Sequence, residues 1–277
     1  MDKKLNLIKS IALCVIAFCM AVAGYLFWEH RNYKEPVVVS EYITEVKKLS
    51  DYFDGVKGTV NDCNVYIFDS GVEGGTFLIW GSTHPEEPAG VMAASLMVEN
   101  LKVTQGKVII IDRENNSAST NTRVGEAYPR FFTYETDWGT KVWRFGDRHA
   151  NQLDSWPDPE VYIHYPSGQT LANVDIRNTN RNWPGKANGL LTERTNYAVM
   201  QLIEQEGVDM TLDLHEAELE YTVENTIVVH EKGQSVAAMV SMMLTAETFD
   251  VPVGMEFSPT ALHGLSHREV GDWSDAA

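Results

Sequence analysis

Apolar runs and segments of helical period alternate along the chain after residue 60. The short apolar runs predict strands at 64–68, 76–80, 107–111, 208–214 and 226–229. Apolar residues spaced three or four positions apart predict helices at 88–101, 192–206 and 234–248. Strands that alternate with helices are typical of an α/β fold with a parallel or mixed sheet.

Each predicted helix has a row of apolar side chains at helical spacing. The rows are Ala93, Met97 and Leu101 in the first helix, Val199, Leu202 and Ile203 in the second, and Val236, Val240, Met243 and Leu244 in the third. Residues 112–190 are different, because they are polar and largely without period. A connection of this length within a compact domain is usually functional.

The N-terminal segment predicts a membrane anchor. The run 11–28 has no charged residue, and as a helix it would be roughly 27 Å long, close to the ~30 Å hydrocarbon core of a bilayer. Lysines at positions 3, 4 and 9 would hold the N-terminus in the cytoplasm. We therefore interpret 1–35 as an anchor with its linker, and 36–277 as a single domain outside the cytoplasmic membrane.

A cleaved signal peptide is the alternative interpretation of the same segment. The sequence Ala-Val-Ala at 21–23 fits a cleavage site, and cleavage near Ala23 would release a secreted protein. Apolar character continues past that site from Tyr25 to Trp28, which favours the anchor.

Charge and cysteine content narrow the class of protein. The chain has 22 Lys and Arg against 39 Asp and Glu, a net charge of −17, and such a surface repels nucleic acid. Cys14 and Cys19 lie in the N-terminal run, so Cys63 is the only cysteine of the body. No disulfide within the body is possible, and its stability must come from its core.

Two predicted strands are followed by residues of the types that bind metals in proteins. The strand 76–80 is followed by His84 and Glu87, and the strand 208–214 by His215. Ligand sites of α/β sheets lie at the carboxyl ends of the strands, so these side chains are expected to meet. Two histidines and one carboxylate form a protein ligand set typical of catalytic zinc. Either histidine alone would be read as a packed or loop residue.

A third motif, Asn180-Arg181, offers amide donors and a planar guanidinium suited to binding a carboxylate with two hydrogen bonds. By itself it would be read as a polar turn, because Pro184-Gly185 follows it.

Together these motifs resemble those of a known family. In chain order they are His84-x-x-Glu87, Asn180-Arg181 and Asp213-Leu214-His215. This order resembles the succinylglutamate desuccinylase/aspartoacylase family, which is related to the zinc carboxypeptidases. The resemblance runs from about residue 60 to the end of the chain. It implies a three-layer α/β/α sandwich of the zinc-carboxypeptidase type with a mixed central sheet.

The resemblance also implies roles for individual residues. It implies that His84, Glu87 and His215 hold one Zn²⁺ ion. It implies that Asn180 and Arg181 bind a carboxylate of the substrate, and Arg177 is a candidate for the arginine that polarises the scissile carbonyl.

Two features depart from the family pattern. Pro85 and Glu86 replace the usual Gly-Asn/Asp pair of the first motif, and Pro85 lacks an N–H group, so the loop backbone is expected to differ. The family's general base is a glutamate on a late strand, which we expect beyond Ala277, so the domain is expected to be incomplete at its C-terminus. Glu269, interpreted as a loop residue, is the candidate for the base within the chain.

These motifs predict a zinc-dependent hydrolase that cleaves the amide bond of an N-acyl amino acid or a related carboxylate-bearing substrate. One alternative is a metallocarboxypeptidase acting on peptides or cell-wall stems. An alternative from another class is a non-catalytic module that binds zinc without hydrolysing anything.

Overall fold

The computed structural model describes residues 2–122, 129–137, 139–217, 225–246 and 251–277. Its helices are α1 (Asp2–Asn32), α2 (Pro88–Asn100), α3 (Asn116–Ser119), α4 (Leu191–Glu206), α5 (Gln234–Thr245) and α6 (Ser266–Trp273). Its strands are β1 (Glu45–Lys48), β2 (Asn64–Asp69), β3 (Thr76–Trp80), β4 (Lys107–Ile111), β5 (Phe131–Thr136), β6 (Gly139–Arg144), β7 (Tyr162–Ile163), β8 (Thr170–Leu171), β9 (Met210–Asp213), β10 (Thr226–Val229) and β11 (Gly254–Phe257).

The central sheet is mixed and has the strand order β1-β2-β4-β3-β9. β4, β3 and β9 run parallel to one another, whereas β1 and β2 each pair antiparallel with their neighbours. Trp80 at the end of β3 lies in register with Ile111 of β4 and Asp213 of β9. The segments that follow these three strands therefore leave the sheet at the same edge.

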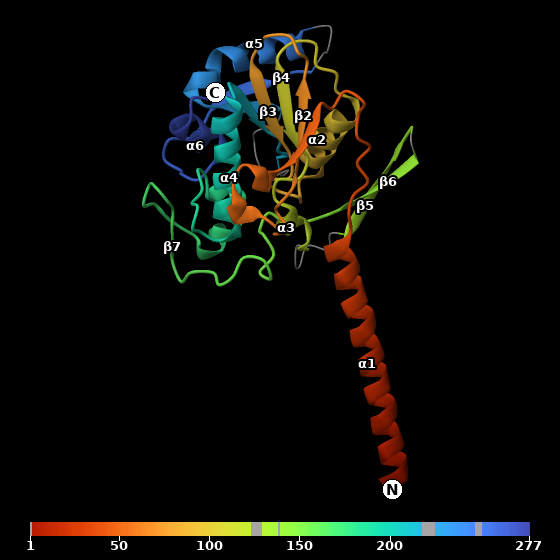
Figure 1. Ribbon diagram of the computed structural model, residues 1–277. Coiled ribbons are helices and arrows are strands. Elements are labelled where there is room, and N and C mark those ends of the chain that lie inside the picture. The colour runs from red at the N-terminus through yellow and green to blue at the C-terminus, as the bar shows by residue number, and fades with distance from the viewer. Residues whose placement is uncertain (1, 123–128, 138, 218–224, 247–250) are drawn as a thin grey trace.

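Helices cover both faces of this sheet, on either side of the central strands (Figure 1). Val65 and Ile67 of β2 belong to the core shared with α4, while the intervening Tyr66 and Phe68 pack in the core shared with α2. This alternation is the two-residue period of a strand buried on both faces. The predicted three-layer α/β/α sandwich with a mixed central sheet is confirmed.

The apolar rows predicted for the helices have different outcomes. In α4 the predicted row is confirmed, because its members are fully or almost fully buried. In α2 the buried row is Val91, Ala94 and Val98, and Met97 and Leu101 pack at its margin. In α5 the row is largely exposed, since Val236 and Met243 are 38% and 58% exposed. A periodic pattern shows that a helix has an apolar face, and it does not show what covers that face.

Several elements were not predicted from the sequence. The hairpin β5–β6 lies within the polar stretch 112–190, and β1 and β11 are too short to give a clear period. β10 and β11 pair parallel with each other in a separate two-stranded sheet. On the outer edge of β9, the N–H of Ala277 donates to the Asp209 carbonyl at 2.9 Å, and the Thr211 N–H donates to the Ala277 carbonyl at 2.8 Å.

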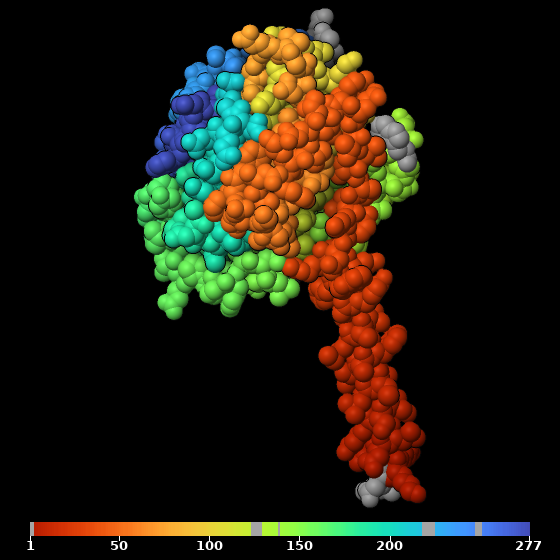
Figure 2. Space-filling view, in the orientation of Figure 1, coloured from red at the N-terminus to blue at the C-terminus, as the bar shows by residue number. Residues whose placement is uncertain are grey.

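α1 projects from one end of the body as an isolated helix (Figure 2). It is long and apolar enough to span a membrane, with a mean hydropathy of 2.3 and no buried residue in its apolar window. Its exit from the body is fixed by ion pairs: Glu35, just beyond α1, accepts from Arg144 Nε at 2.8 Å and from Nη2 at 2.9 Å.

Candidate metal centre and active site

The loop after β3 carries the first motif directly into α2. Pro88 occupies the first turn of α2, where a missing N–H costs nothing, and Glu87 is the residue before the helix. A close approach brings the end of β9 to this point: a Cβ added to Gly90 would lie 2.4 Å from the carbonyl oxygen of Leu214. Only glycine allows the backbones of α2 and the β9 end to pack this closely, and His215 is thereby placed beside Glu87.

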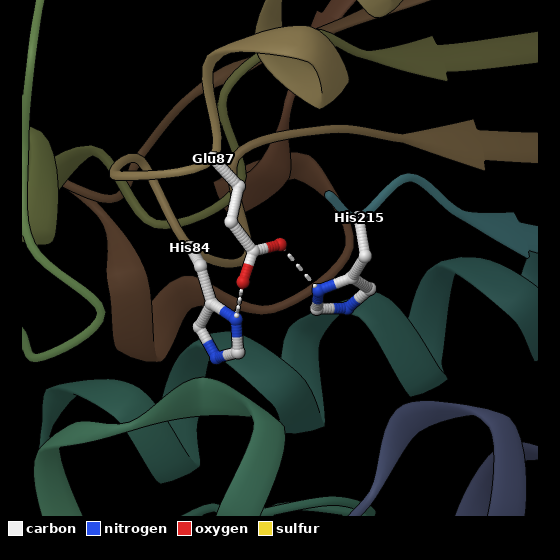
Figure 3. Close-up of side chains that lie close together, drawn as sticks. All are labelled: His84, Glu87 and His215. Atoms are coloured by element: carbon white, nitrogen blue, oxygen red, sulfur yellow. Dashed lines mark hydrogen bonds and ion pairs between the residues drawn. The ribbon is translucent and has the colours of Figure 1, made fainter. Parts of the chain in front are cut away.

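His84, Glu87 and His215 converge as the sequence predicts (Figure 3). His84 Nδ1 lies 2.7 Å from Glu87 Oε1, and His215 Nδ1 lies 2.8 Å from Glu87 Oε2. The ligand atoms that these three side chains offer are all within 4.8 Å of one another. His84 and Glu87 are buried, whereas His215 is exposed, with 28% of its side chain accessible to solvent.

A second set of side chains orients the two imidazoles. Asn178 places its Oδ1 2.9 Å from His84 Nε2, and Asp213 places its Oδ2 3.0 Å from His215 Nε2. With the Nε2 atoms held by these oxygens, the Nδ1 atoms face Glu87, and each would offer a lone pair to a metal ion on loss of its proton. The donor set of two imidazole nitrogens and one carboxylate, each imidazole backed by an oxygen, fits a zinc ion.

Asp213 is itself held by two hydroxyl groups. Thr83 Oγ1 donates to its Oδ1 at 2.7 Å, and Ser266 Oγ donates to its Oδ2 at 2.6 Å. Thr83 precedes His84, and Ser266 begins α6. The loop after β3, the end of β9 and the start of α6 are therefore joined through one carboxylate.

The charges of this cluster are strongly coupled. Burial alone would raise the pKa of Glu87, but hydrogen bonds from His215 and His84 outweigh it and hold that pKa well below its ordinary value. Burial would likewise lower the pKa of His215, but Asp213 and Glu87 raise it to about 10. The carboxylates of Glu87 and Asp213 therefore favour a positive charge between them, which the His215 imidazolium supplies.

The Asn180-Arg181 turn lies against the same neighbourhood. Asn180 Oδ1 accepts from the backbone N–H of Ser266 at 3.0 Å, and its own N–H donates to Asn178 Oδ1 at 3.0 Å. Burial, aided by the positive charges of His215, Arg268 and Arg181, lowers the pKa of the α6 residue His267 to about 4.

The two candidate catalytic residues are engaged elsewhere. Arg177 Nε donates to Asp158 Oδ1 at 2.9 Å, and Arg177 Nη1 donates to the Ala150 carbonyl at 3.0 Å. A catalytic role of Arg177 stays a prediction. Its backbone adjoins Asn178, the partner of His84.

Glu269 was interpreted as a loop residue, and this was wrong, because it lies in the first turn of α6. An eight-residue helix with one strongly apolar position, Val270, gives little periodic signal. The Glu269 carboxylate accepts from Gly264 N at 3.1 Å and Trp273 Nε1 at 3.0 Å, and lies 2.8 Å from His263 Nδ1.

Glu269 also belongs to a second group with metal-ligand chemistry, together with His164 and His263. Both ring nitrogens of His164 already have partners, Ser167 Oγ at 2.8 Å and the Trp183 carbonyl at 2.6 Å. The ring nitrogens of His164, the Nδ1 atom of His263 and the Glu269 carboxylate are thus already engaged in protein hydrogen bonds.

Sequence reasoning missed several polar residues around the centre. Arg148 Nε donates to Glu86 Oε1 at 2.7 Å and so places a guanidinium beside the metal-ligand loop. Glu114 is fully buried just after β4, and burial raises its pKa well above the ordinary value. The rule that located His84 and His215, polar residues directly after a parallel strand, applies equally to Glu114. Asn178 had no such signal, because in the sequence it lies between two 3₁₀ turns and does not follow a strand of the central sheet.

Comparisons with known proteins bear on the fold. No protein-family model and no curated protein matches the sequence. Among solved structures, bovine thrombin-activatable fibrinolysis inhibitor in complex with tick carboxypeptidase inhibitor is similar at a TM-score of 0.50 and 11% identity, covering 84% of this chain and 76% of that one. This likeness supports a carboxypeptidase-like fold.

Both kinds of protein named by the sequence resemblance occur among the structural neighbours. The succinylglutamate desuccinylase/aspartoacylase of Rhodobacter sphaeroides matches at a TM-score of 0.40 and 17% identity, over 66% of this chain and 42% of that one. A metallo-carboxypeptidase of Burkholderia cenocepacia matches at a TM-score of 0.45 and 12% identity, over 82% and 52%. This chain therefore spans about half the length of these two proteins or less.

Proposed function

We propose that this protein is a zinc-dependent hydrolase that cleaves an amide bond in a carboxylate-bearing substrate, such as an N-acyl amino acid. The observation that supports it is the convergence of His84 Nδ1, His215 Nδ1 and the Glu87 carboxylate at the ends of β3 and β9. The oxygens of Asn178 and Asp213 behind the imidazoles support a cation site over a chance contact.

His84, Glu87 and His215 would hold one Zn²⁺ ion. Bound zinc supplies Lewis-acid polarisation of a carbonyl and activation of water at neutral pH. The protein contributes the orientation of the ligands and the low-dielectric surroundings in which charge interactions are strong.

Arginine side chains supply the complementary charge. In this proposal Arg181 binds the substrate carboxylate with its planar guanidinium, and Asn180 holds the turn on which Arg181 sits through its bond to Ser266. Arg148 is better placed than Arg177 to stabilise negative charge on the scissile carbonyl, because its guanidinium contacts Glu86 in the metal-ligand loop.

Glu269 is not the general base in this proposal. Its two oxygens are engaged by His263, Gly264 and Trp273, and its side chain is 2% exposed. A carboxylate so enclosed is a poor acceptor for a proton from a substrate-side group.

We also propose that α1 anchors the domain in the cytoplasmic membrane, with the N-terminus inside and the body outside. Its length, its hydropathy and the lysines at its N-terminal end support this orientation. A secreted form released near Ala23 is the other outcome of export.

The test is a hydrolysis assay of the full chain in detergent, with N-acyl amino acids and peptides supplied in parallel. The proposal predicts release of an amine from N-acyl amino acids by the wild type, and none by Glu87→Ala. His230→Ala is the matched control, because His230 pairs with Asp272 away from the metal centre. Zinc binding without hydrolysis of any substrate would favour a non-catalytic module, and preferential cleavage of peptides would favour a carboxypeptidase.

A further inference from the structure

Five large apolar or aromatic side chains lie exposed on the segment 151–165. They are Leu153 (80% exposed), Trp156 (65%), Val161 (57%), Ile163 (52%) and Tyr165 (51%). We name this set the apolar edge. Solitary exposed apolar residues are ordinary, but a run of them on one segment marks an interaction surface.

The apolar edge begins beside the end of the membrane helix. Asp154 lies between Leu153 and Trp156 in the sequence and forms a two-bond ion pair with Arg31 in the last turn of α1, at 2.5 and 3.2 Å. The segment then runs along the end of the body from which α1 emerges (Figure 1), and Figure 2 shows it as the green surface at that end.

The height of the membrane surface can be placed from α1 itself. Tyr25 and Trp28 stack near the C-terminal end of α1, where aromatic side chains lie at the headgroup level of a spanning helix. Arg31 is three residues further, an axial rise of about 5 Å. Asp154, which binds Arg31, therefore lies close to the headgroups, and Leu153 and Trp156 flank it.

The body is held in one orientation on α1. Arg130 Nη1 donates to the Leu26 carbonyl at 2.7 Å, and the ring of Tyr33 meets Phe131 edge-on at 5.1 Å between centroids. Glu35 is clamped by Arg144 with two hydrogen bonds. With these contacts at the end of α1 and just beyond it, the body is held more firmly relative to the bilayer than it would be on a flexible linker.

The charge of the segment 151–165 indicates which kind of lipid headgroup it can contact. The segment 151–165 contains Asp154, Asp158 and Glu160 and no lysine or arginine. Asp154 and Asp158 are paired with Arg31 and Arg177, so the charge that anionic headgroups would repel is that of Glu160. A zwitterionic headgroup layer accepts apolar and aromatic side chains without that penalty.

We propose that the apolar edge lies in the headgroup layer of the same bilayer that holds α1, as a second membrane contact of the body. This inference rests on the proposed anchoring by α1 and is independent of the proposed hydrolysis. It also places the candidate substrate-binding turn near the lipid surface, because Asp158 binds Arg177 and the Tyr162 hydroxyl donates to the Arg181 carbonyl at 3.0 Å.

Spin labels on single cysteines in the full chain test the proposal in phosphatidylcholine nanodiscs. The native cysteines are replaced (Cys14→Ser, Cys19→Ser, Cys63→Ala), and labels are placed through Leu153→Cys or Trp156→Cys. Val72→Cys is the matched control, since Val72 is also apolar and 54% exposed but lies on the β2–β3 turn at the opposite end of the sheet. A chain that keeps only Cys19 reports whether α1 is in the bilayer.

The readout is the ratio of label accessibility to oxygen, which concentrates in lipid, over a nickel chelate, which stays in water. We expect this ratio to be severalfold higher at 153 and 156 than at 72, with the highest value at 19. If the labels at positions 153 and 156 gave the same ratio as the label at position 72, while the label at Cys19 was in lipid, the apolar-edge proposal would be overturned. The proposed membrane anchor would then still stand. Shielding of 153 from both reagents would mean cover by protein and would also overturn it. An aqueous label at 19 would refute the anchor and this inference together, and the zinc site would be unaffected.

Discussion

Asp213 lies 3.0 Å from the Nε2 atom of His215, on the side of the ring away from Glu87. This contact fixes the imidazole so that its Nδ1 atom faces the Glu87 carboxylate at 2.8 Å. Since Thr83 and Ser266 hold Asp213 in turn, the orientation of one ligand depends on three separate elements of the fold.

Replacing Asp213 should weaken metal binding without abolishing it. The Asp213→Asn variant keeps the shape but loses the charge behind His215, and such partners are typically worth 10–100-fold in metal affinity. Competition for zinc with a chelator measures the loss. Asp209→Asn, at the other end of β9 where Asp209 accepts from Thr76, should leave zinc affinity unchanged. Equal affinities of Asp213→Asn and the wild type would contradict the proposed orienting role.

The guanidinium of Arg181 should matter for substrate binding and not for zinc. Lysine retains the charge of Arg181 but not the planar fork, so Arg181→Lys should lose about 1.5–3 kcal/mol of carboxylate binding, roughly a tenfold to hundredfold rise in KM. Steady-state kinetics together with zinc content separate the two effects. Full affinity of Arg181→Lys for a carboxylate substrate would rule out the proposed role.

The ion pairs of Glu35 at the junction between α1 and the body should lose their stabilising effect in acid. Burial would raise the pKa of Glu35, but Arg113 and Arg144 outweigh it and lower that pKa to about 2 from an ordinary value of 4.5. A lowered folded-state pKa means that the stabilisation is complete above pH 4.5 and is lost as the pH falls toward 2. The shift corresponds to roughly 3 kcal/mol.

Thermal unfolding as a function of pH measures this contribution. The wild type should lose stability between pH 4.5 and 2 more steeply than Glu35→Gln, which has no proton to gain at this position. Parallel curves for the two proteins would show that Glu35 is not the group responsible.

Truncating a side chain where α4 packs against the core should lower the free energy of unfolding. Leu202 is fully buried between α4 and the sheet, so Leu202→Ala should cost about 2–5 kcal/mol of unfolding free energy. Glu204→Ala, at an exposed position of the same helix, should cost less than about 0.5 kcal/mol. Denaturant titration of both variants checks the difference, and similar costs would contradict the assigned packing.

The central strands and the metal cluster were predictable from the sequence for one shared reason. β3, β4 and β9 appear as largely apolar runs, of which β3 and β4 are buried toward their carboxyl ends, and parallel strands deliver the residues that follow them to a common edge. His84 and His215 could therefore be paired across more than a hundred positions without any contact information.

Other features depended on tertiary contacts that no local pattern records. Asn178 faces His84 because two turns of irregular backbone meet, and α6 is short and mostly polar. The hairpin β5–β6 packs aromatic residues beside α1 within a stretch whose composition indicated only polarity. Glu35, expected in a linker, is buried because Arg144 reaches it from β6.

The central claim is that one metal ion binds between His84, Glu87 and His215, and elemental analysis of the purified full chain tests it most directly. The account predicts about one equivalent of zinc per chain in the wild type and in the His230→Ala control, and little or none in His215→Ala. Zinc retained at one equivalent in His215→Ala, or absent from the folded wild type after incubation with the ion, would contradict it.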